Sequence, residues 1–96
     1  MSFRIVFTPE AEETYDAIVD QLRKRWGDGF VVKFENRVSK CFDTLAITPY
    51  LYPVAEENTE IRKCILHKNC SLFYRVYENI VLIICFWDNR QEPFII

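Results

Sequence analysis

The sequence predicts an α+β fold, in which an N-terminal strand leads into an antiparallel two-helix hairpin and then into a three-stranded antiparallel β-meander. Apolar residues recur with a helical period between residues 9 and 48. Three short runs of β-branched and aromatic residues follow after residue 60, and very short connections separate them. The chain has 96 residues, half of them apolar, which is the size of a single domain over residues 1–96.

A strand and a helix are expected at the start of the chain. Alternating apolar residues predict the strand at residues 3–7. Thr8 is suited to cap a helix, and Pro9 is tolerated in a first turn, where its missing N–H costs nothing. Acidic residues near the start of the segment and basic residues near its end complement the helix dipole. The predicted apolar stripe consists of Ala11, Tyr15, Ile18, Leu22 and Trp26.

A second helix follows almost at once. The run Gly27-Asp28-Gly29 interrupts the pattern, and the helical period resumes at Phe30. The helix is expected to end near Thr48-Pro49, because the residue before a proline is disfavoured in the α region. Two helices joined by so short a break pack as an antiparallel hairpin. Residues 50–59 then form a connecting loop.

The second half of the chain is predicted as the meander. Its strands are expected at residues 61–67, 70–77 and 80–87, which are rich in β-branched and aromatic residues. Lys68-Asn69 and Glu78-Asn79 join them, and asparagine tolerates the positive φ that tight hairpin turns require.

Both faces of this meander are apolar. Pairing Tyr77 with Ile80 across the second turn places every second residue on one face. The face without charge is expected to pack on the helices, and it carries Leu72, Tyr74, Val76, Val81, Ile83, Cys85 and Trp87. The other face is left for a partner, and it carries Phe73, Arg75, Tyr77, Ile80, Leu82, Ile84 and Phe86. The parity of strand 61–67, and so the faces of Arg62 and Lys63, stays open.

Charge is distributed unevenly along the chain. A net charge of −2 gives no general case for nucleic-acid binding. Residues 61–90 nevertheless hold five basic residues and two acidic ones, close to several aromatic side chains. Such a patch could bind an anionic partner, either nucleic acid or an acidic peptide. The alternative is a solvated sheet edge that Lys and Arg protect from aggregation.

Few residues suggest catalysis. His67 is the side chain that titrates nearest to neutral pH, so it is the first candidate for proton transfer, although a lone histidine at a strand end is more often idle. The sequence shows no hydrolytic triad, glycine-rich phosphate loop or carboxylate cluster. No cofactor and no metal are therefore expected. Cys41, Cys64, Cys70 and Cys85 form no CxxC pair and are predicted to be buried free thiols.

The cellular location of the protein is predicted from its apolar segments. The N-terminus lacks the basic and apolar regions of a signal peptide. The longest apolar run, residues 80–87, is far shorter than the roughly 20 residues that span a bilayer as a helix. We expect a cytoplasmic protein without a membrane segment.

Local motifs along nearly the whole chain resemble the RelE/ParE superfamily of bacterial toxins, of the ParE-like or plasmid-stabilisation type. The order of a strand, a helical hairpin and a meander is the same. The motifs are Phe7-Thr8-Pro9-Glu10-Ala11-Glu12-Glu13, Ile61-Arg62-Lys63, Ser71-Leu72-Phe73-Tyr74-Arg75-Val76 and Phe86-Trp87-Asp88-Asn89-Arg90-Gln91-Glu92-Pro93. The last is the most specific, because a final strand followed by a polar turn and Arg-x-x-Pro recurs in these toxins.

The resemblance implies a growth-inhibiting toxin of a type II toxin-antitoxin module, neutralised by a cognate antitoxin in a hetero-oligomer. ParE-like members inhibit DNA gyrase without catalysis of their own. RelE-like members are ribosome-dependent endoribonucleases that cleave mRNA without metal. A third reading is a non-toxic remnant that only binds its antitoxin. The acidic pI, and the lack of a tyrosine or histidine after Arg90, favour the gyrase target.

The resemblance also implies site residues. Carried over by position, Arg90 belongs to a RelE-like catalytic site, with Arg62, Lys63 and His67 as its neighbours. The partner-binding residues are expected to be Phe73, Arg75, Tyr77, Trp87 and Arg90. These residues would contact an antitoxin that covers the second face of the sheet.

Overall fold

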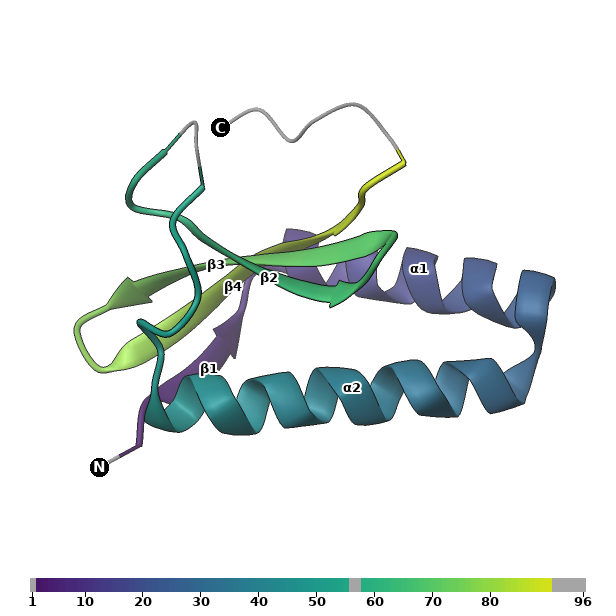
Figure 1. Cartoon of the computed structure of the whole chain (residues 1–96), viewed down its shortest axis with the longest axis horizontal. Helices are drawn as coiled ribbons and strands as arrows, with labels where there is room; N and C mark the ends of the chain where they lie inside the picture. Colours follow the sequence, from purple (N-terminus) through teal and green to yellow (C-terminus); the bar gives the residue numbers. More distant parts are fainter. Residues whose placement is uncertain (1, 56–57, 91–96) are drawn as a thin grey trace.

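Two helices cover one face of a four-stranded sheet in residues 2–55 and 58–90, which the computed structural model describes (Figure 1). The elements in chain order are β1 (Arg4–Phe7), α1 (Pro9–Trp26), α2 (Asp28–Ile47), β2 (Arg62–His67), β3 (Cys70–Tyr77) and β4 (Ile80–Asp88). This order confirms the predicted α+β fold. Neither helix of this part of the chain is long and apolar enough to cross a membrane. Residues 91–93 of the C-terminal motif lie outside the described residues.

The sheet has the order β1-β4-β3-β2. Strands β2, β3 and β4 form the predicted antiparallel meander. Strand β1 adds to it by pairing parallel with β4, with Arg4 opposite Ile80 and Phe7 opposite Ile83. A parallel pair needs a long crossover connection, which begins here with the two helices. The sheet is therefore mixed, whereas the sequence had assigned no partner to the first strand.

Thr8 joins the start of α1 to the sheet. Its hydroxyl oxygen accepts a hydrogen bond from the Ala11 N–H at 3.0 Å, as expected of an N-cap. The same hydroxyl donates to the carbonyl oxygen of Ile84 at 2.7 Å, and the Thr8 N–H donates to that of Ile83 at 3.1 Å. One residue thus begins the helix and fixes it to β4.

Gly27 alone separates the two helices. Its φ of 90° lies in the region that only glycine adopts readily, and its N–H donates to the Arg23 carbonyl oxygen at 2.9 Å. The second helix begins at Asp28, two residues earlier than the predicted Phe30, because the helical conformation resumes directly after this glycine. It ends as predicted at the residue before Pro49, where Thr48 is the C-cap.

The larger core lies between the helices and the sheet. Tyr74 is fully buried there, and its hydroxyl donates to the Pro49 carbonyl oxygen at 2.8 Å. Cys64 and Leu66 of β2 point into the same core, which settles the parity of that strand. Arg62 therefore shares the helix side, while Lys63 lies near Phe73 on the other face.

A β-bulge in β4 changes which residues face the helices. Phe73 pairs with Cys85 and Tyr74 pairs with Ile83, so Ile84 is the extra residue. Beyond the bulge, Phe86 joins the core under the helices, and Cys85 and Trp87 join Phe73 on the opposite face. The faces predicted for Cys85, Phe86 and Trp87 were therefore wrong, whereas Ile84 lies on the predicted face.

The second face of the sheet is partly covered by the chain itself. Ala55 and Ile61, from the segment before β2, pack with Phe73 and Cys85 in a small cluster. A partner is thus not needed to cover this part of the face. In the β3–β4 turn the positive φ of 53° belongs to Glu78, whereas the sequence had favoured the asparagine for it.

Candidate functional site

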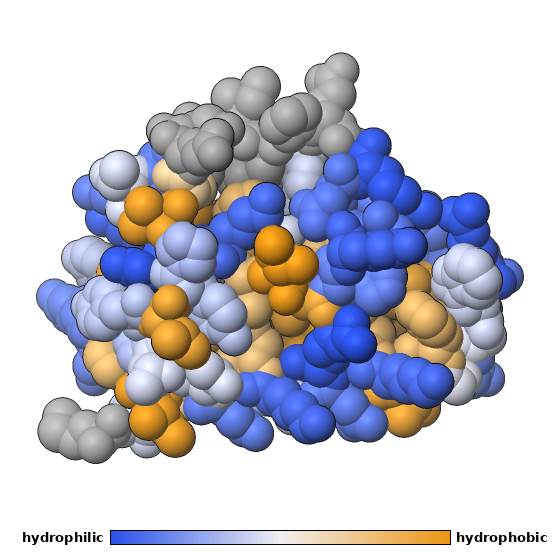
Figure 2. Space-filling model, viewed as in Figure 1, coloured by the Kyte–Doolittle hydropathy of each residue, from blue (hydrophilic) through white to orange (hydrophobic). Residues whose placement is uncertain are grey.

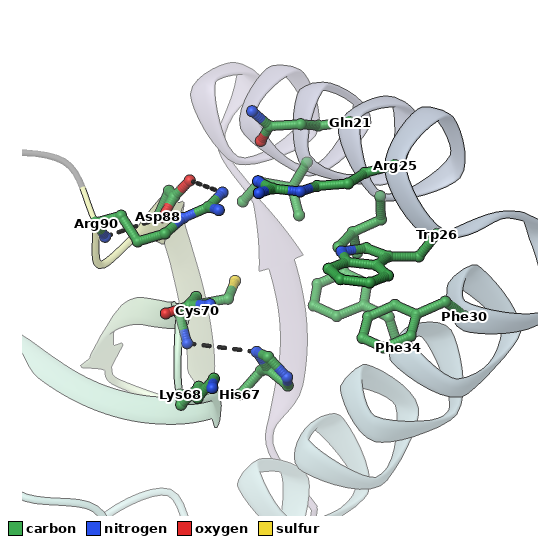
Figure 3. Close-up of a pocket in the computed structure, with 13 residues that line it drawn as sticks. Gln21, Arg25, Trp26, Phe30, Phe34, His67, Lys68, Cys70, Asp88 and Arg90 are labelled. Atoms are coloured by element: carbon green, nitrogen blue, oxygen red, sulfur yellow. Dashed lines mark hydrogen bonds and ion pairs between the residues drawn. The ribbon is translucent and has the colours of Figure 1, made fainter.

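A cavity of about 350 Å³ lies beside the junction of the helices, which we call the hairpin cavity (Figure 3). Both helices, the β2–β3 turn and the end of β4 contribute to its walls. Its lining residues are Ile18, Gln21, Leu22, Arg25, Trp26, Phe30, Phe34, His67, Lys68, Asn69, Cys70, Asp88 and Arg90. Residues from distant parts of the chain therefore meet here.

Aromatic rings form one wall of the hairpin cavity. The ring centroids of Trp26 and Phe30 are 5.9 Å apart, and Phe30 meets His67 edge-on at 6.0 Å. The guanidinium of Arg25 lies 5.7 Å from the centroid of Trp26. Trp26 was predicted as the last residue of the buried helix stripe, yet it is 61% exposed. It is accessible because the stripe continues past the edge of the sheet and ends at the cavity.

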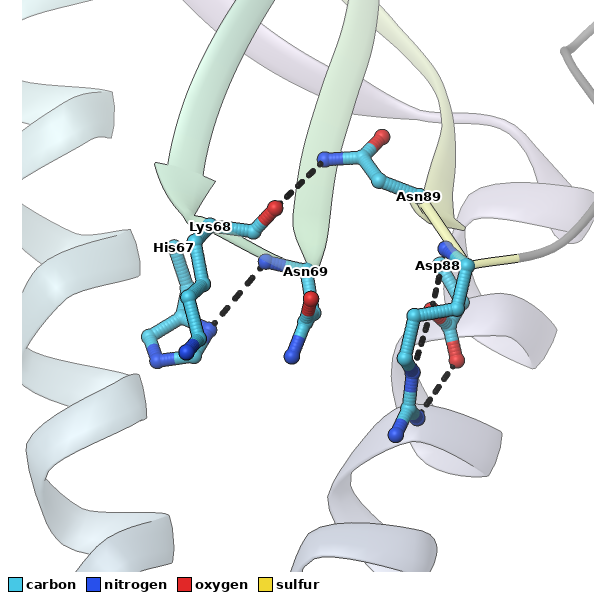
Figure 4. A network of polar contacts seen from close by, with 6 residues as sticks. His67, Lys68, Asn69, Asp88 and Asn89 are labelled. Atoms are coloured by element: carbon cyan, nitrogen blue, oxygen red, sulfur yellow. Dashed lines mark hydrogen bonds and ion pairs between the residues drawn. The ribbon is translucent and has the colours of Figure 1, made fainter.

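His67 is held as a neutral imidazole in this cavity. Its Nδ1 accepts a hydrogen bond from the Asn69 N–H at 3.3 Å, so the proton of the neutral ring is on Nε2 (Figure 4). Partial burial lowers the pKa of His67, and the nearby charges of Arg37 and Lys68 lower it further. Nε2–H is thus a donor at neutral pH.

Asp88 fixes the side chain of Arg90. The Arg90 guanidinium donates to the two carboxylate oxygens at 3.0 and 2.8 Å, and the Arg90 backbone N–H adds a bond of 2.9 Å (Figure 3). The hydrogen bond from Arg90 lowers the pKa of Asp88. Asn89 ties this corner to the neighbouring turn through its N–H, which donates to the Asn69 carbonyl oxygen at 2.7 Å. Arg90 is therefore preorganised at the end of β4.

The charges of the hairpin cavity suit an anionic ligand. Among its described lining residues, the cations Arg25, Lys68 and Arg90 outnumber the one carboxylate, Asp88. An aromatic wall beside cations accommodates a ring or an apolar side chain together with a negative charge. Within residues 2–55 and 58–90, no group of three or more His, Cys, Asp or Glu side chains could hold a metal ion.

The structure divides the four residues of the predicted catalytic site. His67 and Arg90 line the hairpin cavity together. Arg62 instead donates to the carbonyl oxygen of Tyr52 at 2.6 Å and lies 5.2 Å from the ring centroid of Tyr50. Its guanidinium is thus used to hold the loop after α2.

Lys63 also lies apart from the hairpin cavity. Its ammonium group is 5.9 Å from the ring centroid of Phe73, on the face of the sheet that points away from the helices. Only two of the four predicted catalytic residues therefore share one cavity.

The predicted partner-binding residues differ in exposure. Phe73 is 5% exposed and Trp87 is half-buried against the same small cluster. Tyr77 is 53% exposed, and Arg75 lies 5.7 Å from its ring while pairing with Glu60 at 3.5 Å. Figure 2 shows the apolar side chains of one face of the molecule as separate patches among hydrophilic residues. Tyr77 and Arg90 are therefore the exposed residues of this set, and Arg75 is half-buried beside Tyr77.

Sequence reasoning missed most of the residues that line the hairpin cavity. Among them are Arg25, Trp26 as an exposed residue, and Asp88 as the partner of Arg90. The spacing of Asp88 and Arg90 after a strand was a usable signal, because side chains two residues apart at a strand end point to the same side. The role of Arg25 had no local signal, since a basic residue near a helix end is explained by the helix dipole alone.

Several solved structures share this fold, and two of them come from toxin-antitoxin systems. A chain from the chromosomal ParDE system of P. aeruginosa superposes with a TM-score of 0.76 at 18% identity, covering 90% of this chain and 95% of the other. The YoeB dimer from Staphylococcus aureus gives 0.64 at 15% identity, with coverage of 88% and 94%. The E. coli DinJ-YafQ complex gives 0.64 at 11% identity, with coverage of 94% and 96%. The superpositions show that the fold is shared, and at identities this low they show the fold alone.

The family follows from the sequence match. The family described as the ParE toxin of the type II toxin-antitoxin system, parDE, matches residues 5–93. The chain belongs to this family and is a type II toxin-antitoxin system toxin. No curated protein sequence matches it closely enough to add a relative.

Proposed function

We propose that the free toxin stops growth by inhibiting DNA gyrase without catalysing a reaction, and that a cognate antitoxin neutralises it in the cytoplasm. The observation that carries this proposal is the separation of the predicted catalytic residues. Arg62 holds backbone carbonyls and Lys63 lies on another face, so His67 and Arg90 lack two cations that a RelE-like site would use. Membership of the ParE toxin family supports the same target.

The antitoxin is expected to contact two places. Arg75 and Tyr77 offer a half-buried cation, paired with Glu60, and an exposed aromatic ring at one end of the second sheet face. Arg90 offers a second cation at the hairpin cavity. An acidic, partly apolar antitoxin segment would complement both, because charge complementarity and aromatic anchors dominate such contacts. Similar folds in the ParDE and DinJ-YafQ structures support a protein partner of this kind.

A ribosome-dependent endoribonuclease is the second candidate, and one observation favours it. His67 and Arg90 line a common cavity, where a neutral imidazole could move a proton and a guanidinium could stabilise phosphate charge. In that reaction the 2′-hydroxyl of the ribose attacks the adjacent phosphate. The third candidate, a remnant that binds its antitoxin without toxicity, would show no growth arrest.

Induction of the chain alone and together with its antitoxin tests these candidates. Gyrase inhibition predicts growth arrest, loss of supercoiling and intact mRNA, all reversed by the antitoxin. Codon-phased mRNA ends on ribosomes with normal supercoiling would instead support the ribonuclease. Continued growth in the presence of soluble, folded chain would support the third candidate, a non-toxic remnant that binds its antitoxin. The gene of the antitoxin should lie beside that of the toxin.

A further inference from the structure

Two cysteines face each other between α2 and β2. The Sγ atoms of Cys41 and Cys64 are 3.2 Å apart, although 23 positions separate them in sequence. Cys41 is 6% exposed and Cys64 is 2% exposed. Cys70 and Cys85 are also buried, and the Cys70 Sγ lies 3.9 Å from the carbonyl oxygen of Ser71. The Cys41–Cys64 pair is therefore a dithiol built into the interface of a helix and a strand.

The two thiols share a hydrogen bond that makes them chemically different. The hydrogen bond between the two sulfurs lowers the pKa of the Cys64 thiol and raises the pKa of the Cys41 thiol. The Tyr52 hydroxyl also stabilises the Cys64 thiolate by hydrogen bonding. Because the thiolate is the reacting species, Cys64 is the nucleophile of the pair and Cys41 is the resolving thiol.

We propose that Cys41 and Cys64 are a peroxide-oxidised site that closes to a disulfide joining α2 to β2. The Cys64 thiolate attacks one oxygen of hydrogen peroxide, the O–O bond breaks, and a sulfenic acid forms while hydroxide leaves and is protonated to water. The Cys41 thiol then attacks the Cys64 sulfur, the S–O bond breaks, and water leaves with the Cys41 proton. Two hydrogen atoms are lost from the pair and peroxide is reduced to water.

The geometry requires little movement for this closure. A disulfide has an S–S distance of about 2.05 Å, so the sulfurs must approach by roughly 1.1 Å from their separation of 3.2 Å. Both residues sit on regular elements that already pack together, α2 and β2. The remaining approach has to come from rotation of the two side chains and a small shift of the helix.

The disulfide would hold one wall of the hairpin cavity. Strand β2 ends at His67, and α2 contributes Phe30 and Phe34 to the same cavity. The Arg37 side chain of α2 already donates to the Leu66 carbonyl oxygen at 3.0 Å across this interface. Oxidation adds a covalent link beside that hydrogen bond. The inference stands whichever target the toxin has.

Mass spectrometry of the full-length toxin treated with hydrogen peroxide tests the site. We expect the mass to fall by two hydrogen atoms, and peptide mapping to find the Cys41 peptide linked to the Cys64 peptide. Dithiothreitol should restore both free thiols. We also expect the Tm to rise by about 10 °C on oxidation, because a cross-link restricts the unfolded chain.

Matched variants separate this site from general thiol oxidation. Cys41→Ser and Cys64→Ser should lose both the cross-link and the Tm rise, whereas the double variant Cys70→Ala/Cys85→Ala should keep them. The proposal would be overturned if the cross-link formed through Cys70 or Cys85, or if oxygen were added without a cross-link. Thiols that stay reduced in the folded wild-type chain would overturn it as well. The wild-type and double-variant results suffice even if a serine variant fails to fold.

Discussion

The two faces of the sheet differ in how far their side chains are buried. The face under the helices is closed, and its central residues Leu72, Tyr74 and Ile83 have no exposed surface. The opposite face has a small cluster around Phe73 and Cys85, and an exposed end at Tyr77. Burial on the first face stabilises the fold, because free energy scales with apolar area removed from water. The second face leaves side chains available to a partner.

This difference shows why a small toxin can bind a partner without giving up stability. Ala55 and Ile61 cover the middle of the second face, so the apolar residues there do not depend on an antitoxin. We therefore expect an antitoxin to contact the exposed end of that face and the hairpin cavity. Substitutions on the two faces should therefore separate stability from partner binding.

The largest expected effect is on the closed face. Leu72→Ala removes a fully buried side chain and leaves a cavity, so the free energy of unfolding should fall by about 3 kcal/mol. Urea denaturation measures this. Ile65→Ala is the matched control, since Ile65 is 66% exposed on the neighbouring strand and should change stability by less than about 0.5 kcal/mol. Equal losses in both variants would refute the division between the faces.

The next effect concerns binding. Tyr77→Ala should weaken the complex with the antitoxin by at least roughly tenfold, because an exposed aromatic anchor beside Arg75 is lost. Stability should stay nearly unchanged. Isothermal titration calorimetry with the purified antitoxin measures the affinity, and Tyr50→Ala is a control with similar exposure, 61%, outside this end of the face. Unchanged affinity would remove Tyr77 from the interface.

A smaller loss of stability is expected when a single buried hydroxyl group is removed. Tyr74→Phe deletes the hydroxyl that donates to the Pro49 carbonyl oxygen at 2.8 Å and leaves that buried carbonyl unpaired. The cost should be about 1–2 kcal/mol. Thermal unfolding of the variant measures it, and a stability equal to that of the wild type would show that the bond contributes nothing.

The smallest effect is a pH dependence. The folded state holds the pKa of His67 below the ordinary value of 6.5, so the unfolded chain binds the proton more readily. The free energy of unfolding should therefore decrease as pH falls below 6.5 and be independent of this group above it. His67→Gln should flatten the part of the curve that lies just below pH 6.5. An unaltered slope would assign that pH dependence to other groups.

Local patterns predicted most of the fold. The cap at Thr8, the break between the helices at Gly27, the helical periods and the short turns of the meander depend on neighbours in sequence, and each appears in the structure. The bulge at Ile84 was missed because no glycine marks it. The parallel pairing of β1 with β4 was missed because it joins segments far apart in sequence.

The site was predicted less completely for the same reason. His67 and Arg90 were singled out and do share a cavity, but their neighbours Trp26 and Phe30 come from the helix junction. The approach of Cys41 to Cys64 depends on how α2 lies on β2. Contacts between elements of this kind leave no spacing signature in one sequence.

Supercoiling by purified DNA gyrase is the most direct test of the proposed activity. We predict that the free toxin inhibits the reaction, that the antitoxin restores it, and that Arg90→Ala weakens the inhibition while His67→Gln does not. Normal supercoiling in the presence of folded toxin, together with mRNA cleavage on ribosomes that His67→Gln abolishes, would contradict a non-catalytic gyrase inhibitor.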